Sequence, residues 1–185
     1  MKINFGCGFN KKSGYLNVDK FDTCSPDLLA DLDVFPWPLD SDSVDESFFN
    51  HSLEHMAASA DGFIQLMQEL YRVSKHQAII QIHVPHPRHD NFIGDPTHVR
   101  IITPQVLTLF SKKLNLHWQK VGAANSPLAL YAGVDFEIKN VNQILENKFM
   151  EMLQKGEISE EDLRTLANER NNVISEYQIT LQVIK

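Results

Sequence analysis

The chain has 185 residues, of which 43% are hydrophobic and 22% charged, a composition typical of a soluble globular protein and a length that suits one domain. Its formal net charge of −7 is spread along the chain, so no basic stripe of the kind that nucleic-acid-binding proteins carry is present. Without an apolar run of about 20 residues, a signal segment or a disulfide framework, we expect a cytoplasmic protein with two reduced cysteines and no membrane or nucleic-acid partner.

The N-terminal half alternates apolar strands with connections, a pattern typical of a parallel sheet with crossover helices. The predicted strands are Ile3–Phe5, Tyr15–Val18, Leu28–Ala30, Val44–Phe49 and Ala78–Val84. Before the last of these, apolar residues recur at spacings of three and four from Ala58 to Val73, as on one face of a helix. Another helix is predicted to begin at Thr103-Pro104, where a capping hydroxyl precedes a proline suited to the first helical position.

The C-terminal part contains two strictly alternating segments, which predict antiparallel strands with one solvated face. Their apolar positions are Val134, Phe136 and Ile138 in the first, and Tyr177, Ile179, Leu181 and Val183 in the second. Between them we predict a helical insertion over about 141–173, in which Ser159 caps a helix and Asp162 occupies the capping-box position. The apolar residues of this insertion fit a homodimer surface, a lid or core packing.

The most informative motif is the glycine turn that follows the first strand. Gly6 and Gly8 allow the backbone to approach a ligand closely, because glycine has no Cβ. Asp19 ends the second strand, where a carboxylate can accept hydrogen bonds from the two hydroxyls of a ribose. In a dinucleotide site the acid follows the glycines by about 20 residues and a helix N-terminus holds the pyrophosphate. The shorter spacing here predicts a nucleoside ligand without phosphates, for which S-adenosylmethionine is the first candidate.

Four stretches of the first two-thirds of the chain together resemble the class I S-adenosylmethionine-dependent methyltransferases, and in particular a small bacterial subfamily that begins at the glycine motif without an N-terminal helix. They are Asn4–Gly8, Gly14–Asp19, Phe35–Pro38 continuing through Ser43–Asp45 to Asn50–His55, and Glu69–Val73 followed by Ile79–Val84. The chain departs from the family at Lys75–Ala78, where a Lys-Pro-Gly-Gly turn is usual, and in the shortened helix at Asn10–Ser13. The resemblance implies a single domain over residues 1–185 with a Rossmann-like α/β fold. Its sheet would be mostly parallel and seven-stranded, with a terminal antiparallel hairpin.

The resemblance also implies where the cofactor lies. The glycine turn would contact the methionine moiety and Asp19 the ribose. Asp31 would bind the adenine amino group, unless it forms only a local Asx-turn, and the N–H of Leu32 would bind the ring. His51 could contact the cofactor or the substrate, or fill a gap behind the sheet. The predicted cofactor set is Phe5, Gly6, Cys7, Gly8, Asp19, Asp31, Leu32, Asn50 and His51.

Residues 86–98 carry a second concentration of polar side chains, after the fifth strand and at the carboxyl edge of the sheet. Methyl transfer from a sulfonium needs a positioned acceptor, and a hydroxyl acceptor must also lose its proton, for which histidine is suited. We predict His98 as the proton acceptor, Asp95 as the group that orients it, and His86 as the second choice. The adjacent Glu54 and His55 are interpreted as structural, since neighbours on a helix point in different directions.

The expected function is methylation of a small polar acceptor, with O-methylation of a sugar or related metabolite favoured over N-methylation. The polar loop also leaves other interpretations open, since its residues could merely fix the loop. A metal site formed by His86, His89, Asp90 and His98 is a rival, although these residues lack a fixed ligand spacing. A non-catalytic S-adenosylmethionine-binding or scaffolding protein is the alternative from another functional class.

Overall fold

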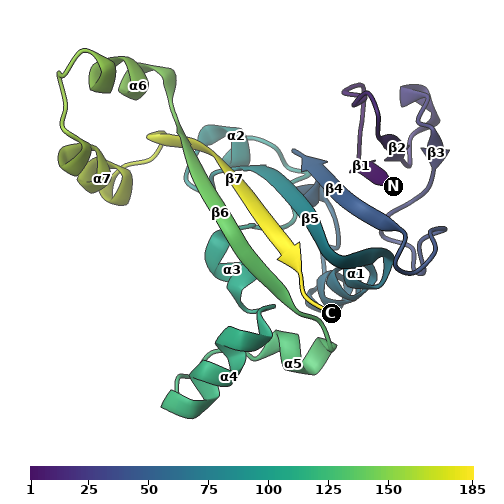
Figure 1. Cartoon of the computed structure of the whole chain (residues 1–185). Coiled ribbons are helices and arrows are strands. Elements are labelled where there is room, and N and C mark those ends of the chain that lie inside the picture. The colour runs from purple at the N-terminus through teal and green to yellow at the C-terminus, as the bar shows by residue number, and fades with distance from the viewer.

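A seven-stranded sheet with the order β3-β2-β1-β4-β5-β7-β6 organises the chain in the computed structural model, which describes all 185 residues (Figure 1). Its strands are β1 (Lys2–Phe5), β2 (Leu16–Asp19), β3 (Leu28–Leu29), β4 (Val44–Asn50), β5 (Ser74–Pro85), β6 (Phe136–Leu145) and β7 (Ile174–Val183). The pairings among β1 to β5 are parallel, whereas β7 is antiparallel to both β5 and β6. The predicted fold class, a mostly parallel Rossmann-like sheet closed by an antiparallel hairpin, is therefore confirmed.

The strand order reverses between β1 and β4. From β1 the chain moves outward through β2 to β3, and then returns to the other side of β1 to form β4 and β5. In open parallel sheets such a reversal leaves a crevice beyond the carboxyl ends of the two central strands, and ligands bind there. The glycine turn follows β1 and His51 follows β4, so both predicted site regions lie at this reversal.

Helices occupy the later connections of the sheet. They are α1 (Ala60–Val73), α2 (Asp90–Ile93), α3 (Pro104–Thr108), α4 (Lys112–Val121), α5 (Leu128–Ala132), α6 (Asn147–Gln154) and α7 (Glu160–Glu169), with 3₁₀ turns η1 (Asp22–Cys24) and η2 (Leu53–His55). The predicted cap at Thr103 is confirmed, since its side chain accepts from the N–H of Val106. None of these helices is long and apolar enough to cross a lipid bilayer.

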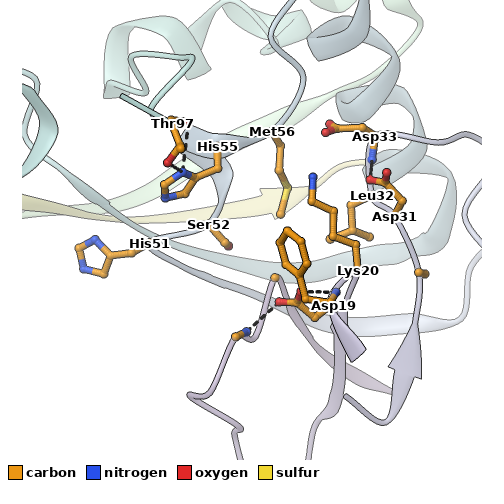
Figure 2. Close-up of a pocket in the computed structure, with 14 residues that line it drawn as sticks. Asp19, Lys20, Asp31, Leu32, Asp33, His51, Ser52, His55, Met56 and Thr97 are labelled. Carbon is orange, nitrogen blue, oxygen red and sulfur yellow. Dashed lines mark hydrogen bonds between the residues drawn. The ribbon is translucent and has the colours of Figure 1, made fainter. Parts of the chain in front are cut away.

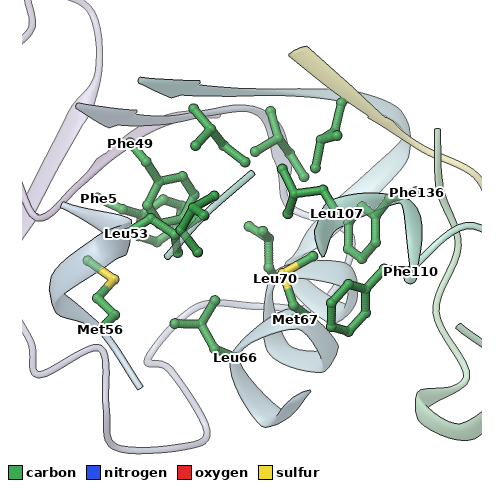
Figure 3. Close-up of a cluster of buried hydrophobic side chains, with 14 of the residues drawn as sticks. Phe5, Phe49, Leu53, Met56, Leu66, Met67, Leu70, Leu107, Phe110 and Phe136 are labelled. Carbon is green, nitrogen blue, oxygen red and sulfur yellow. The ribbon is translucent and has the colours of Figure 1, made fainter. Parts of the chain in front are cut away.

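The main core lies between the sheet and α1, α3 and the segment after α3. Figure 3 shows Phe5 and Phe49 at one end of this cluster, with Phe110 and Phe136 at the other. The rings of Phe5 and Phe49 stack with centroids 5.0 Å apart. Along β5 and β7 buried apolar residues alternate with half-exposed ones. One face of these strands therefore packs against the core.

The β6–β7 hairpin extends beyond the body of the molecule and carries α6 and α7 at its far end (Figure 1). These helices have a small apolar cluster of their own, made of Phe149, Leu163 and Val173. The predicted cap of the second helix is confirmed, because Ser159 accepts from the N–H of Asp162. The predicted start of the helical insertion at about 141 is wrong. Strand β6 continues to Leu145 because it remains paired with β7, so the first helix begins at Asn147.

Candidate functional site

A cavity of about 410 Å³ opens at the reversal of strand order (Figure 2). Its volume is within the range of about 300–1,000 Å³ that small-molecule sites occupy. The cavity has two ends: Asp31 and Asp33 lie at one, His51, His55 and Thr97 at the other, and Asp19 lies between them. Its lining residues are Gly6, Gly8, Asp19, Lys20, Phe21, Ala30, Asp31, Leu32, Asp33, His51, Ser52, His55, Met56 and Thr97.

The glycine turn forms the floor of this cavity. Gly6 has a φ of +65°, and a Cβ built on it would lie 2.7 Å from the Cβ of Ser52, so no other residue fits without a shift of the backbone. Gly8 has a φ of +50°, and a Cβ there would meet nothing within 4 Å. The backbone at Gly8 therefore faces open space, as the prediction of close ligand approach requires.

Asp19 is held at the end of β2 by the backbone. Its two carboxylate oxygens accept from the N–H of Gly8 at 2.8 Å and from the N–H of Phe21 at 3.0 Å. The residue is only 7% exposed, yet it lines the cavity. Each carboxylate oxygen can accept more than one hydrogen bond, so the pair remains able to bind the hydroxyls of a ligand.

The loop after β3 forms the end of the cavity at which Asp31 and Asp33 lie. Asp31 accepts from the N–H of Asp33 at 3.0 Å, which is the Asx-turn of the alternative interpretation. Asp33 in turn accepts from the N–H of Ala57 at 2.7 Å. Leu32 is buried between them, and its carbonyl accepts from the indole of Trp37. Asp31 is exposed and lines the cavity, and only one of its oxygens accepts in the turn, so its local turn and a role in adenine binding are compatible.

His51 follows β4 directly and lies at the other end of the cavity, with His55 and Thr97. Its φ of +50° is uncommon for a residue with a side chain and marks a constrained position of the kind that clusters at functional sites. The Nε2 atom lies 2.8 Å from a carboxylate oxygen of Glu176 on β7. Because a carboxylate can only accept, Nε2 carries the proton, and in the neutral ring Nδ1 keeps its lone pair.

Two further histidines lie close together beside it, with ring centroids 4.6 Å apart: His55 of η2 and His98 of the loop after α2. The N–H groups of Val99 and Arg100 donate to the carbonyl of Glu54 and fix this loop on η2. His55 Nδ1 lies 3.2 Å from the carbonyl of Thr97, and His98 Nδ1 lies 2.8 Å from the carbonyl of Phe92. Carbonyl oxygens accept only, so Nδ1 is the donor in both rings, and in the neutral form of each ring Nε2 keeps its lone pair.

Glu54 lies between these histidines and is 1% exposed. Neither carboxylate oxygen has a hydrogen-bond partner. The closest ring nitrogens, His51 Nδ1 at 3.7 Å and His98 Nε2 at 3.9 Å, lie beyond hydrogen-bond range. Burial, reinforced by the negative charges of Asp95 and Glu176, raises the pKa of Glu54 to about 7. Burial likewise lowers the pKa of His55.

The cavity includes six of the nine predicted cofactor residues: Gly6, Gly8, Asp19, Asp31, Leu32 and His51. The side chain of Phe5 points into the core, Cys7 is buried, and Asn50 does not line the cavity. Their predicted contacts with the cofactor remain untested.

None of the three predicted catalytic residues lines the cavity. His98 lies against His55, and Asp95 bonds to Thr97. His86 is 8% exposed and packs against the ring of Tyr177, and burial lowers the pKa of its imidazole. Their catalytic roles stay predictions. The four residues of the rival metal proposal, His86, His89, Asp90 and His98, do not form a metal-sized group.

Sequence reasoning missed part of the cavity wall. Phe21 is 60% exposed and lines the cavity, and its signal in the sequence was an aromatic residue only two positions after Asp19, the residue predicted to bind the ribose. Lys20, Asp33, Ser52 and Met56 had no sequence signal of their own. His55 was assigned a structural role from helical geometry, whereas it belongs to a 3₁₀ turn and lines the cavity.

Comparison with known proteins finds the fold in solved structures only. No protein-family model matches the chain, and no curated protein matches it. An S-adenosylmethionine-dependent methyltransferase of Archaeoglobus fulgidus is similar with a TM-score of 0.62 and 19% identity, over 98% of this chain and 85% of the other. One of Methanosarcina mazei is similar with a TM-score of 0.54 and 14% identity, over 99% and 92%.

The cyclase SpnF is also similar, with a TM-score of 0.55 and 13% identity, over 99% of this chain and 74% of the other. The chain therefore has the fold of S-adenosylmethionine-dependent methyltransferases, and that fold also occurs in a protein named for another reaction. The reaction has to be argued from the site itself.

Proposed function

We propose that the protein is an S-adenosylmethionine-dependent methyltransferase that methylates an oxygen of a small polar acceptor, such as a sugar or a related metabolite. The observation that carries this proposal is the polarity of one continuous cavity. A ribose-binding carboxylate, Asp19, lies in its middle, and lone pairs of histidine nitrogens lie at one end. This arrangement suits a nucleoside methyl donor beside an acceptor that has a proton to lose.

The cofactor fits the part of the cavity from the Asp31 loop to the glycine turn. Asp19 would bind the ribose hydroxyls, and Asp31 would bind the adenine amino group beside the exposed ring of Phe21. The methionine moiety would then lie along Gly6 and Gly8, where a Cβ at Gly8 would meet no atom. In this direction the methyl group would point toward His51 and His55.

The acceptor is then bound at the end formed by His51, His55 and Thr97. The acceptor oxygen forms the new bond to the methyl carbon while the bond from that carbon to sulfur breaks, and sulfur leaves as a neutral thioether. The acceptor proton passes to His51 Nδ1, because Glu176 holds the opposite nitrogen of that ring protonated. His98, the proton acceptor predicted from the sequence, lies behind His55 and would act through that ring.

The proposal is tested by calorimetry followed by an activity screen. The full chain is titrated with S-adenosylhomocysteine, and the same protein is then incubated with labelled S-adenosylmethionine and a panel of sugars and sugar nucleotides. Binding with methyl transfer to oxygen supports the proposal. Failure to bind S-adenosylhomocysteine at millimolar concentration would contradict it. Binding without transfer to any acceptor would favour the non-catalytic alternative.

A further inference from the structure

Glu54 presents a chemical problem that methyl transfer alone does not explain. Its carboxylate is 1% exposed and has no hydrogen-bond donor for either oxygen. An unpaired buried carboxylate is costly, and buried charges in proteins are normally paired or coordinate a metal. When it is ionised, Glu54 therefore has no hydrogen-bond donor or cation bound to either of its oxygens.

Two histidines beside Glu54 are held so that one nitrogen of each neutral ring keeps a lone pair. His98 donates its Nδ1 proton to the carbonyl of Phe92, so in the neutral ring the Nε2 atom that lies 3.9 Å from Glu54 Oε1 is an acceptor. His55 donates its Nδ1 proton to the carbonyl of Thr97 in the same way. A histidine whose second nitrogen is bound to a backbone carbonyl is the usual arrangement of a metal-binding histidine.

One ligand atom from each of Glu54, His55 and His98 lies within 4.8 Å of the others, and no other three His, Cys, Asp or Glu residues of the chain meet so closely. Bonds of about 2.0–2.2 Å to a tetrahedral ion place its ligand atoms about 3.3–3.6 Å apart, so these side chains need to close by roughly 1 Å. A possible fourth ligand is near, because Asp95 Oδ2 lies 3.8 Å from His98 Nε2.

We propose that Glu54, His55 and His98 form a binding site for a divalent transition-metal ion, with Zn²⁺ the best match, at the acceptor end of the cavity. Two imidazoles with one carboxylate are a ligand set that zinc and similar ions use, and three protein ligands leave a coordination position for another molecule. His55 lines the cavity while Glu54 and His98 lie behind it, so the open position faces the cavity.

The ion would hold the acceptor oxygen and make its hydroxyl more acidic, as bound metals do for water. This role rests on the proposed function, whereas occupancy of the site does not. In this site His98 is a metal ligand, whereas the sequence suggests a proton acceptor. Glu54 and His55 bind the same ion. The acceptor class that best uses such an ion carries adjacent hydroxyls or a hydroxyl beside a carboxylate, because both groups can bind one ion.

The test is metal titration of the full chain after removal of metals with a chelator. Zn²⁺ binding is followed by calorimetry, and Co²⁺ is used as a probe because its visible spectrum reports coordination by nitrogen and oxygen. We expect one ion per chain. Glu54→Gln should weaken Zn²⁺ binding by at least about 100-fold, since even an outer-shell partner of a metal site contributes about 10–100-fold. His55→Gln serves as a second variant if Glu54→Gln does not fold.

Two histidine variants are matched controls. His117→Ala removes an exposed imidazole on α4, and His89→Ala removes one member of the rival set. Both should bind Zn²⁺ within about twofold of the unaltered chain, because neither residue belongs to the proposed ligand set. Absence of a bound ion, unchanged binding in Glu54→Gln and His55→Gln, or loss of binding in His89→Ala would each overturn the proposal. S-adenosylhomocysteine binding to the metal-free protein is measured in parallel, so failure of the metal site and failure of the proposed function are told apart.

Discussion

The two ends of the cavity differ in how their polar groups are satisfied. We call the part of the cavity formed by Asp31, Asp33 and the adjoining Asp19 the cofactor end, after its proposed role. Here Asp19 and Asp33 accept from backbone N–H groups, and Asp31 does so within its own turn. At the end formed by His51, His55 and Thr97, the acceptor end, the neighbouring Glu54 has no hydrogen-bond donor, and the nearest ring nitrogens lie 3.7 Å and 3.9 Å away. The carboxylates at the cofactor end are therefore hydrogen-bonded before any ligand binds, whereas the carboxyl group of Glu54 is not. Binding at the cofactor end should therefore depend on its fixed geometry, whereas the properties of the acceptor end should depend on the ion or substrate that binds there.

The cofactor end is tested most strongly at Asp19. Asp19→Ala should lower the affinity for S-adenosylhomocysteine by roughly 10³-fold, because two hydrogen bonds from the ribose to a charged group are lost. Calorimetry measures the change. Asp19→Asn is the matched variant, since it keeps the shape and one acceptor oxygen and should lose less. Affinity close to that of the unaltered chain in Asp19→Ala would place the ribose elsewhere.

At the acceptor end the largest expected effect belongs to His51. His51→Asn should lower turnover by at least about 100-fold through loss of the proton acceptor, with the affinity for S-adenosylhomocysteine changed by less than about twofold. Asparagine tolerates the positive φ of this position better than other residues, so the backbone is retained. A joint loss of affinity and turnover, measured by calorimetry and single-turnover kinetics, would instead indicate a role in cofactor binding.

The lack of a partner for the buried carboxyl group of Glu54 should also affect how the free energy of unfolding depends on pH. Burial raises the pKa of Glu54 from 4.5 to about 7 in the folded chain, so between these values the folded state binds more protons than the unfolded state. The free energy of unfolding of the metal-free protein should therefore fall as pH rises from about 4.5 to 7, by on the order of 2–3 kcal/mol, and then level off.

Urea unfolding in the presence of a chelator measures this slope. Glu54→Gln should remove most of it, because the amide does not titrate. An unchanged slope in that variant would mean that another group causes the pH dependence, and the contrast between the two ends would lose one of its supports.

The smallest expected effect is at Phe21, whose exposed ring lies at the cavity beside the Asp31 loop. Phe21→Ala should weaken S-adenosylhomocysteine binding about tenfold, as expected for loss of stacking on a base. Phe9→Ala removes a ring that is also exposed but does not line the cavity, and calorimetry should show no change for it. Equal effects of the two substitutions would argue against stacking at Phe21.

The cofactor end was largely predictable from the sequence because its constraints are local. Gly6 must be glycine for steric reasons, and Asp19 ends a strand whose pattern is visible in the neighbouring residues. The acceptor end depends on contacts between distant segments. Glu54 and His98 are brought together by hydrogen bonds from Val99 and Arg100 to the carbonyl of Glu54, and no local pattern encodes those bonds.

The helices that the sequence analysis missed have the same explanation. α4 and α5 are short, and a buried side chain joins them. Asn115 of α4 donates to the carbonyl of Leu109 and accepts from the N–H of Ala129 at the start of α5. Asparagine is a poor helix former. Asn115 therefore stabilises the folded region through its hydrogen bonds, but in the sequence it argues against a helix at this position.

Arg88 joins the outlying helices to the acceptor loop. Its guanidinium donates to the carbonyls of Ala167 and Asn168 at the end of α7, and its own carbonyl accepts from the N–H of Asn172. Ten residues later the same loop supplies His98. Hydrogen exchange in residues 88–98 should therefore slow down and speed up together with exchange in residues 167–172, and a molecule bound to α7 would alter exchange in residues 88–98 without touching the cavity.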